Sequence, residues 1–286
     1  MKKSAHALAV LVVAGSIPTF ALAEDAPAAP AAAPAPAAEA ASPITYNIGV
    51  VSDYRYRGIS QTKMKPAVQG GVDYANGPIY VGTWLSTISW VKDSMVATNR
   101  ANAGNEDFTP VEEKGAPVEW DLYGGTKGDI IKDSLTYDVG VLGYIHLGEK
   151  FKDIGLKSPN TVEVYGALTY GVFTAKVSIA GTTLFGVPKS AGSQYYDLSA
   201  NFDLGSGFTL TPDIGYQNVA GSYAKDNGLD SYSYTTYSAT LAKDFGKGLS
   251  ATLQVVATDA SKSDYVTSAG KFTGRTGVVA GVKYSF

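Results

Sequence analysis

Cysteine is absent from the sequence, which excludes disulfide frameworks and thiolate metal sites. Histidine is scarce, with two in 286 residues, so there is little material for a metal centre or a catalytic base. Acidic residues outnumber basic ones, 26 to 23, which removes the electrostatic footprint of a nucleic-acid binder. No apolar run reaches the roughly 20 residues of a membrane-spanning helix. We therefore predict no cofactor, no metal and no nucleic-acid partner.

The first 43 residues indicate export rather than a folded domain. Lys2 and Lys3 precede an apolar stretch at 7–14, and Ala-Leu-Ala at 21–23 fits a small-residue cleavage site. We predict that residues 1–23 are a secretory signal peptide, cleaved after Ala23. Residues 24–43 are almost wholly Ala and Pro, which favours a semi-extended periplasmic tether without a core. The folded domain is then expected at residues 44–286.

Glycine and tyrosine are abundant, and apolar and polar residues alternate with a period of two. Tyr46, Ile48 and Val50 fall on one face of an extended segment, whereas Asn47 and Gly49 fall on the other. About twelve such segments follow one another, with ten to fourteen allowed by the pattern, and no sustained helical periodicity interrupts them. The alternation predicts an all-β fold.

The connections between these segments differ in length in a regular way. Short ones lie at Asn76-Gly77, Gly171, 204–207 and 245–248, and long ones lie near 92–117, 147–160, 181–192, 218–231 and 259–274. Two connections fit less well, because the first long one is only about 58–65 and the one at 124–134 is long for its side. Alternating short and long connections are typical of an up-and-down barrel in the outer membrane of a Gram-negative bacterium.

We therefore predict a closed antiparallel transmembrane β-barrel, since an open sheet edge would leave backbone groups unpaired in lipid. Its last strand must pair with its first. A secreted soluble β protein is the alternative, because half-buried strands alternate in the same way. The C-terminal aromatics Tyr284 and Phe286 have the form of a signal for the barrel assembly machinery. Association into homo-oligomers is left open.

Aromatic rings near strand ends indicate an interfacial girdle, since amphipathic rings settle where headgroups meet hydrocarbon. The candidates are Tyr54, Tyr56, Tyr74, Tyr80, Trp90, Trp120, Tyr170 and Tyr284. Outer-membrane lipids are the partners that this girdle implies.

Charged residues on the opposite parity are expected to face the lumen, because Arg or Lys facing mid-bilayer lipid costs about 2–4 kcal/mol. The candidates are Asp53, Arg55, Arg57, Asp73, Glu119, Asp121, Asp138, Glu163, Asp197 and Asp213. They predict a polar path for small solutes or ions, with an excess of acids that favours cations. The alternative is an interior clogged by salt bridges, in a structural or adhesive barrel without conductance.

An outer-membrane enzyme that hydrolyses lipids or peptides is the competing class. His146 is the one histidine beyond the signal peptide, and it ends a segment just before a long connection. A catalytic base would need a nucleophile or an activated water within reach. A single rim histidine is more often simply polar, so we predict that the protein is not an enzyme.

The stretch from residue 49 to residue 87 resembles the TorF family of porin-like bacterial outer-membrane proteins. The matching positions are Ser52, Asp53, Tyr54, Arg57, Gly58, Ser60, Gln61, Thr62, Pro66, Gly77, Tyr80, Gly82, Trp84 and Ser86. Weaker echoes extend the resemblance over most of 44–286. The resemblance implies a barrel and a pore, and it implies no particular solute.

Overall fold

A computed structural model describes residues 42–101, 116–228 and 231–286. The predicted signal peptide and nearly all of the predicted tether lie outside these residues. Residues 102–115 of the long connection predicted near 92–117 also lie outside them. Among the described residues, no helix combines the length and apolar character needed to cross a membrane.

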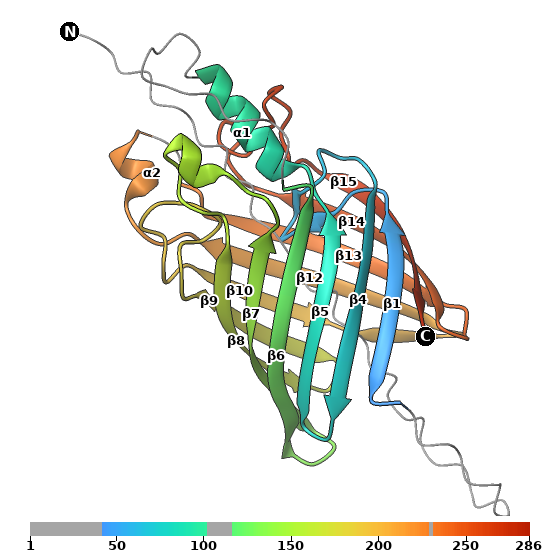
Figure 1. The fold of residues 1–286 in the computed structure, drawn as a ribbon. Helices are drawn as coiled ribbons and strands as arrows, with labels where there is room; N and C mark the ends of the chain where they lie inside the picture. Colours follow the sequence, from blue (N-terminus) through green and yellow to red (C-terminus); the bar gives the residue numbers. More distant parts are fainter. Residues whose placement is uncertain (1–41, 102–115, 229–230) are drawn as a thin grey trace, which may run out of the picture.

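One antiparallel sheet closes on itself to form the wall of a barrel (Figure 1). Apart from β10 and β11, which both pair with β12, each wall strand pairs with the next along the chain, and the last strand pairs with the first from Asn47↔Ser285 to Val51↔Gly281. The wall strands are β1 (Ile44–Val51), β4 (Ala67–Asn76), β5 (Ile79–Thr87), β6 (Val118–Ile131), β7 (Leu135–His146), β8 (Thr161–Tyr170), β9 (Phe173–Ala180), β10 (Gln194–Ala200), β11 (Phe202–Gly205), β12 (Phe208–Asn218), β13 (Tyr234–Asp244), β14 (Leu249–Thr258) and β15 (Gly277–Ser285).

Two of these strands form a single wall position. β10 and β11 are separated only by Asn201, and both pair with β12. Within the described residues the wall therefore has twelve strands. The prediction of a closed antiparallel barrel with about twelve strands is confirmed.

The two ends of the barrel differ, and we call them the turn end and the loop end. At the turn end, the connections at 77–78, 132–134, 171–172, 206–207 and 245–248 are short. The expectation of a long connection at 124–134 is wrong, because β6 continues to Ile131 and Asp133 turns the chain with a φ of 58°. At the loop end, the connections at 52–66, 88–117, 147–160, 181–193, 219–233 and 259–276 are long.

Small elements occupy the loop end (Figure 1). They are β2 (Arg55–Tyr56), β3 (Ile59–Ser60), α1 (Trp90–Ala101), the 3-10 turn η1 (Phe151–Ile154) and α2 (Tyr223–Asp226). Helix α1 corrects the expectation that no helical segment interrupts the strands. Its buried Val91 and Met95 are four residues apart and so lie on one face of the helix. One such pair is too short a pattern to be recognised in the sequence as sustained helical periodicity.

The outer face of the wall is apolar along its whole circumference. Every wall position exposes at least one large apolar side chain: Ile48, Val68, Val81, Leu122, Val141, Val164, Phe173, Leu198, Ile214, Tyr237, Leu253 and Val278. The alternate residues point inward and are mostly polar or glycine. The period-two pattern of the sequence thus separates an apolar exterior from a polar interior.

Four inward tyrosines lie flat against the wall over glycines. Tyr123 covers Gly82, Tyr80 covers Gly125, Tyr165 covers Gly140 and Tyr195 covers Gly215; in each pair a Cβ on the glycine would collide with the tyrosine ring or hydroxyl. The missing side chains let bulky rings fill the wall rather than project across the interior.

Replacing one of these glycines should overpack the wall. A Cβ at Gly125 would collide with the Tyr80 hydroxyl and the Val139 carbonyl, so we expect Gly125→Ala to destabilise the barrel by about 1–3 kcal/mol. Urea unfolding in lipid vesicles measures this change. Gly166→Ala is the matched control, since its nearest neighbour, Val139 Cγ1, would lie 3.7 Å from the new Cβ. Equal stabilities for the two variants would contradict the packing role of Gly125.

Candidate functional site

The connection between β1 and β4 enters the barrel instead of passing outside it. We call residues 52–66 the plug. Val51 and Ala67, on either side of it, are paired directly across the two strands, so the plug begins and ends at one point on the rim. Tyr56 and Ile59 within it are 0% exposed. The first long connection is therefore an internal segment, which explains why it looked too short for an external loop.

The tip of the plug is a tight hairpin. β2 and β3 pair at Tyr56↔Ile59, leaving Arg57 and Gly58 as a two-residue turn. Both have positive φ, 43° and 83°, as a type I′ hairpin turn requires. For Arg57 this backbone costs on the order of 1 kcal/mol. Gly58 carries no side chain because a Cβ there would meet the methyl groups of Thr236 and Thr258.

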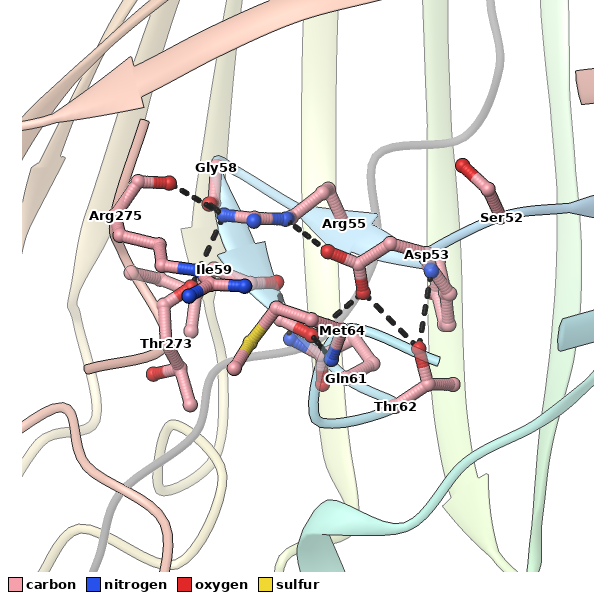
Figure 2. A network of polar contacts seen from close by, with 12 residues as sticks. Ser52, Asp53, Arg55, Gly58, Ile59, Gln61, Thr62, Met64, Thr273 and Arg275 are labelled. Carbon is pink, nitrogen blue, oxygen red and sulfur yellow. Dashed lines mark hydrogen bonds and ion pairs between the residues drawn. The ribbon is translucent and has the colours of Figure 1, made fainter. Parts of the chain in front are cut away.

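Asp53 organises the base of the plug (Figure 2). Its carboxylate accepts hydrogen bonds from Arg55 Nε at 2.5 Å, Ser60 Oγ at 2.6 Å and Thr62 Oγ1 at 3.0 Å. Three donors on one buried carboxylate hold the two limbs of the plug together.

Arg55 ties this network to the last long connection of the chain (Figure 2). Its Nη1 donates to the carbonyl oxygens of Gly58, Thr273 and Arg275, at 2.9, 3.0 and 3.0 Å. Arg55 is thus committed to positioning backbone, and only Arg57 of the two plug arginines reaches the far wall.

Arg57 makes the deepest polar contacts of the plug. Its guanidinium donates to both carboxylate oxygens of Glu163 on β8, at 3.1 and 2.8 Å, and to Gln217 Oε1 on β12, at 2.7 Å. The rings of Tyr56 and Tyr195 face its Cζ at 4.6 and 4.2 Å. We call these four residues, Glu163, Gln217, Tyr195 and Tyr56, the guanidinium site.

The electrostatics of the guanidinium site favour a charged arginine. Burial, the largest effect, acts to lower the pKa of Arg57, but the Glu163 carboxylate together with Tyr56 and Tyr144 outweighs it and holds that pKa above its ordinary value. Tyr144 donates to Glu163 Oε2 at 3.1 Å and accepts from Tyr56 at 3.3 Å, so the ion pair belongs to a longer polar chain. A buried bidentate pair of this kind fixes position as well as charge.

A second group of acids lies beside the guanidinium site. Glu119 accepts from the Tyr54 hydroxyl at 2.6 Å. Burial, and then Glu119 and Asp121, raise the pKa of Tyr54, which keeps this phenol neutral and able to donate. The Asp121 carboxylate is buried, and its Oδ1 has no hydrogen-bond partner among the described residues.

Two other loop-end connections, 88–117 and 259–276, contact the plug or each other and hold the plug in place. Asp93 on α1 forms an ion pair with Lys63 of the plug. The same carboxylate accepts from the backbone N–H of Ser268 at 2.7 Å and from its hydroxyl at 2.5 Å. The backbone N–H of Ser89 donates to Gln61 O at 2.9 Å. Three connections that are remote in sequence are therefore interlocked.

The predicted lumen residues all lie inside the barrel, although not all on its wall. Asp53, Arg55 and Arg57 belong to the plug, and Asp73, Glu119, Asp121, Asp138, Glu163, Asp197 and Asp213 point inward from wall strands. Among these ten described residues there are two ion pairs, one between Arg55 and Asp53 and one between Arg57 and Glu163. Their role in a pore stays a prediction.

The interior changes character along its length. Near the loop end, Glu119, Glu163 and Gln217 are at most 2% exposed. Toward the turn end, the inward residues Asp73, Asp138, Lys176, Asp197 and Asp213 are partly accessible to solvent. The interior is thus sealed near the loop end, where the plug lies, and partly accessible to solvent toward the turn end.

Four of the girdle predictions are wrong. Tyr54 and Tyr56 belong to the plug, and Tyr80 points inward, donating to Asp138 Oδ1 at 2.5 Å. Trp90 begins α1, is 1% exposed, and packs on Phe185 and His146. The alternation of Asp53, Arg55 and Arg57 with the two tyrosines imitated a wall strand, but that strand ends at Val51.

The remaining girdle candidates do lie on the outer face. Tyr74, Tyr170 and Tyr284 are exposed, and Trp120 lies on the same face of β6 as the exposed Leu122. Tyr284 and Tyr46 both stack on Phe286, with ring centroids 5.6 and 5.7 Å apart. Contact of these rings with lipid stays a prediction.

His146 is buried rather than placed on the rim. Its Nε2 lies 3.4 Å from Glu119 Oε2, its Nδ1 lies 3.4 Å from Asn160 Oδ1, and Trp90 packs edge-on at 5.0 Å. The side chain is 1% exposed, so its surroundings offer a substrate no access in this structure.

Sequence reasoning missed Gln217, Tyr195 and Thr236, which meet Arg57 from β12, β10 and β13. Thr236 Oγ1 donates to the Arg57 carbonyl at 2.7 Å. Neutral side chains at alternating wall positions carry no local signal, and only the fold brings them to one arginine.

A family profile described as "Bacterial protein of unknown function (Gcw_chp)" matches residues 37–286. The TorF name is not confirmed by this match. A search of proteins with curated functions found no match to the chain.

Solved porin structures are among those to which the chain is similar. The NanC porin has 9% identity and a TM-score of 0.48, covering 85% of this chain and 98% of that one. The outer-membrane channel DcaP of Acinetobacter baumannii has 13% identity and a TM-score of 0.38, covering 85% and 72%. A mutant of the Rh. blastica porin has 12% identity and a TM-score of 0.35, covering 77% and 55%, so this chain spans about half of that porin. Likeness at this level identifies neither a solute nor a mechanism.

Breaking the Arg57–Glu163 pair should destabilise the protein strongly. We expect Glu163→Gln to cost about 3–5 kcal/mol, because a buried guanidinium loses its counter-charge. Adding Arg57→Met should cost less than the sum of the two single changes. Asp226→Asn is the control, since its exposed pair with Lys189 at 3.8 Å contributes less than about 1 kcal/mol. Strict additivity in urea unfolding would contradict a direct interaction.

Proposed function

The chain belongs to the bacterial Gcw_chp family, and we propose that it is an outer-membrane channel for small polar solutes or ions, closed at one end by its own plug. Two observations support a membrane position. The outer face of the wall is apolar around the whole barrel, and the sheet closes on itself. Water would disfavour an apolar surface of this extent, whereas lipid would solvate it. Closure pairs the backbone groups that lipid cannot satisfy.

The orientation follows from the two ends. In barrels of this class, short turns face the periplasm and long loops face the exterior. The turn end would then be periplasmic and the plug would close the external half. Tyr74, Tyr170 and Tyr284 would lie near the periplasmic interface, as part of the predicted girdle.

The channel itself is supported by the interior. Twelve strands enclose more space than the eight whose side chains just fill a barrel. The interior at the turn end is polar and partly accessible to solvent. Its inward acids Asp73, Asp138, Asp197 and Asp213 outnumber the inward bases Lys127, Lys176 and Lys283, which favours cations. The observation that carries the proposal is that the sealed half is filled by a segment of the chain held inside the barrel by noncovalent contacts.

A plugged barrel without conductance is the second candidate. It is favoured by the depth at which Tyr56, Arg57 and Ile59 are buried. In that case the plug is a permanent core of the external half. The two candidate functions differ in whether the plug can withdraw from the interior of the barrel.

The export signal and assembly through Phe286 belong to the same proposal, and homo-oligomer formation stays open. The expected order is cleavage after Ala23, followed by insertion through the barrel assembly machinery, with outer-membrane lipids as the surrounding partner. Electrophoresis of the mature protein with and without heating would report the compact barrel and any oligomer.

Removing the plug should open the channel. Because Val51 and Ala67 are direct strand partners, residues 52–66 can be replaced by the two-residue turn Asn-Gly without moving the wall. We expect this variant to show steady conductance in planar bilayers, and the unaltered protein to open only rarely. Replacing residues 223–228 with the same turn is the control, because α2 buries none of its residues.

The outcomes separate the two candidate functions. A plug-free barrel that folds but carries no current would contradict the channel. A steady conductance in the unaltered protein, equal to that of the variant, would contradict closure by the plug.

A further inference from the structure

The guanidinium site is built mainly from the wall and not from the plug. Glu163, Gln217 and Tyr195 are contributed by β8, β12 and β10, and only Tyr56 comes from the plug itself. If the plug withdrew, the wall would retain a carboxylate, an amide oxygen and an aromatic face at the same positions. Tyr144, which donates to Glu163 at 3.1 Å, would keep that carboxylate oriented.

These groups suit one kind of ligand. Two carboxylate oxygens at 3.1 and 2.8 Å match the parallel N–H groups of a guanidinium, and Gln217 Oε1 at 2.7 Å accepts from the same nitrogen as one of them. The Tyr195 ring, 4.2 Å from Cζ, supplies a face for a planar cation. The Glu163 carboxylate would repel an anion, and a neutral solute would leave the charge of Glu163 uncompensated.

The charge of the surroundings also favours a cation there. Glu119 and Asp121 are buried beside Glu163, and within the part of the chain that the structure describes Asp121 Oδ1 has no hydrogen-bond partner. The nearby bases are His146, which faces Glu119, and Lys176, whose Nζ lies 4.3 Å from the Tyr165 ring centroid. Loss of Arg57 would leave three carboxylates in a poorly solvated space.

A route to the site runs along the same strands. Asp197 lies two residues from Tyr195 on β10, and Asp213 lies four residues from Gln217 on β12, both toward the accessible turn end. Both aspartates point inward and are partly accessible to solvent. They would attract a cation toward Glu163 from that side.

We infer that the guanidinium site is a binding site for small solutes that carry a guanidinium group, and that Arg57 occupies it as a tethered substitute. This inference rests on the proposed channel and names the class of solute. A free solute and Arg57 compete for Glu163, so binding of the solute favours the withdrawn plug. The left-handed backbone of Arg57 works against the plugged state and makes exchange easier.

The tether sets the expected affinity. Arg57 is held at a high effective concentration, so the unaltered protein should bind a free guanidinium compound weakly. Its apparent affinity is reduced by the small fraction of molecules whose site is vacant. Removing the arginine side chain should therefore strengthen binding rather than weaken it.

Agmatine is the probe, because it carries a guanidinium without a carboxylate. Calorimetric titration of the full-length protein in detergent would compare the unaltered chain, Arg57→Ala and Arg57→Ala with Glu163→Gln. Arg57→Gln repeats the test if the alanine variant does not fold, with folding checked by heat-dependent mobility. Putrescine, which replaces the guanidinium with an ammonium, tests the planar group.

We expect agmatine to bind Arg57→Ala at least tenfold more tightly than the unaltered protein. Adding Glu163→Gln should weaken that binding by roughly 10- to 100-fold, the usual range for a lost charged hydrogen bond. Equal binding to the two Arg57→Ala proteins, or none to any, would overturn the inference. Because calorimetry needs no current, binding without conductance would leave this site intact while contradicting the channel.

Discussion

The closed sheet is the constraint from which the rest of the structure follows. An apolar exterior requires every wall backbone group to find its partner within the sheet, and the pairing of β1 with β15 meets that requirement. Twelve strands then enclose an interior too wide for wall side chains alone to fill. Tyrosines laid over glycines thicken the wall, and the segment between the first two wall strands fills the remaining space at the loop end.

Filling that space with a polar segment has a physical consequence. A core of apolar side chains would be permanent, whereas the plug is attached through ion pairs and hydrogen bonds whose partners could also be satisfied by water or solutes. The apolar contacts of Tyr56 and Ile59 act in the opposite sense. The balance between the two sets of contacts decides whether the barrel is a closed structure or a channel, and Arg57 lies at the point where both meet.

The sequence was sufficient for the wall and insufficient for the plug. Period-two alternation is a local property, so it identified the strands, their number and the inward side of Glu119, Asp138 and Asp213. The plug depends on contacts between residues 106 and 160 positions apart, such as Arg57 with Glu163 and Gln217. Alternation alone does not distinguish a hairpin inside a barrel from the end of a wall strand when both alternate charge with tyrosine.

Tyrosine is the residue that made this distinction hard, because its ring and hydroxyl suit both environments. On the outer face, Tyr74 and Tyr284 present rings at an apolar surface, whereas inside the barrel Tyr54, Tyr80 and Tyr144 use their hydroxyls on inward-facing carboxylates. A better criterion lies in the partners of the neighbouring residues. An arginine within a few residues of Asp and Gly, as at Arg55 and Arg57, needs buried acceptors that a lipid-facing strand cannot offer. Charge that alternates with tyrosine near a glycine turn is therefore evidence for an internal segment.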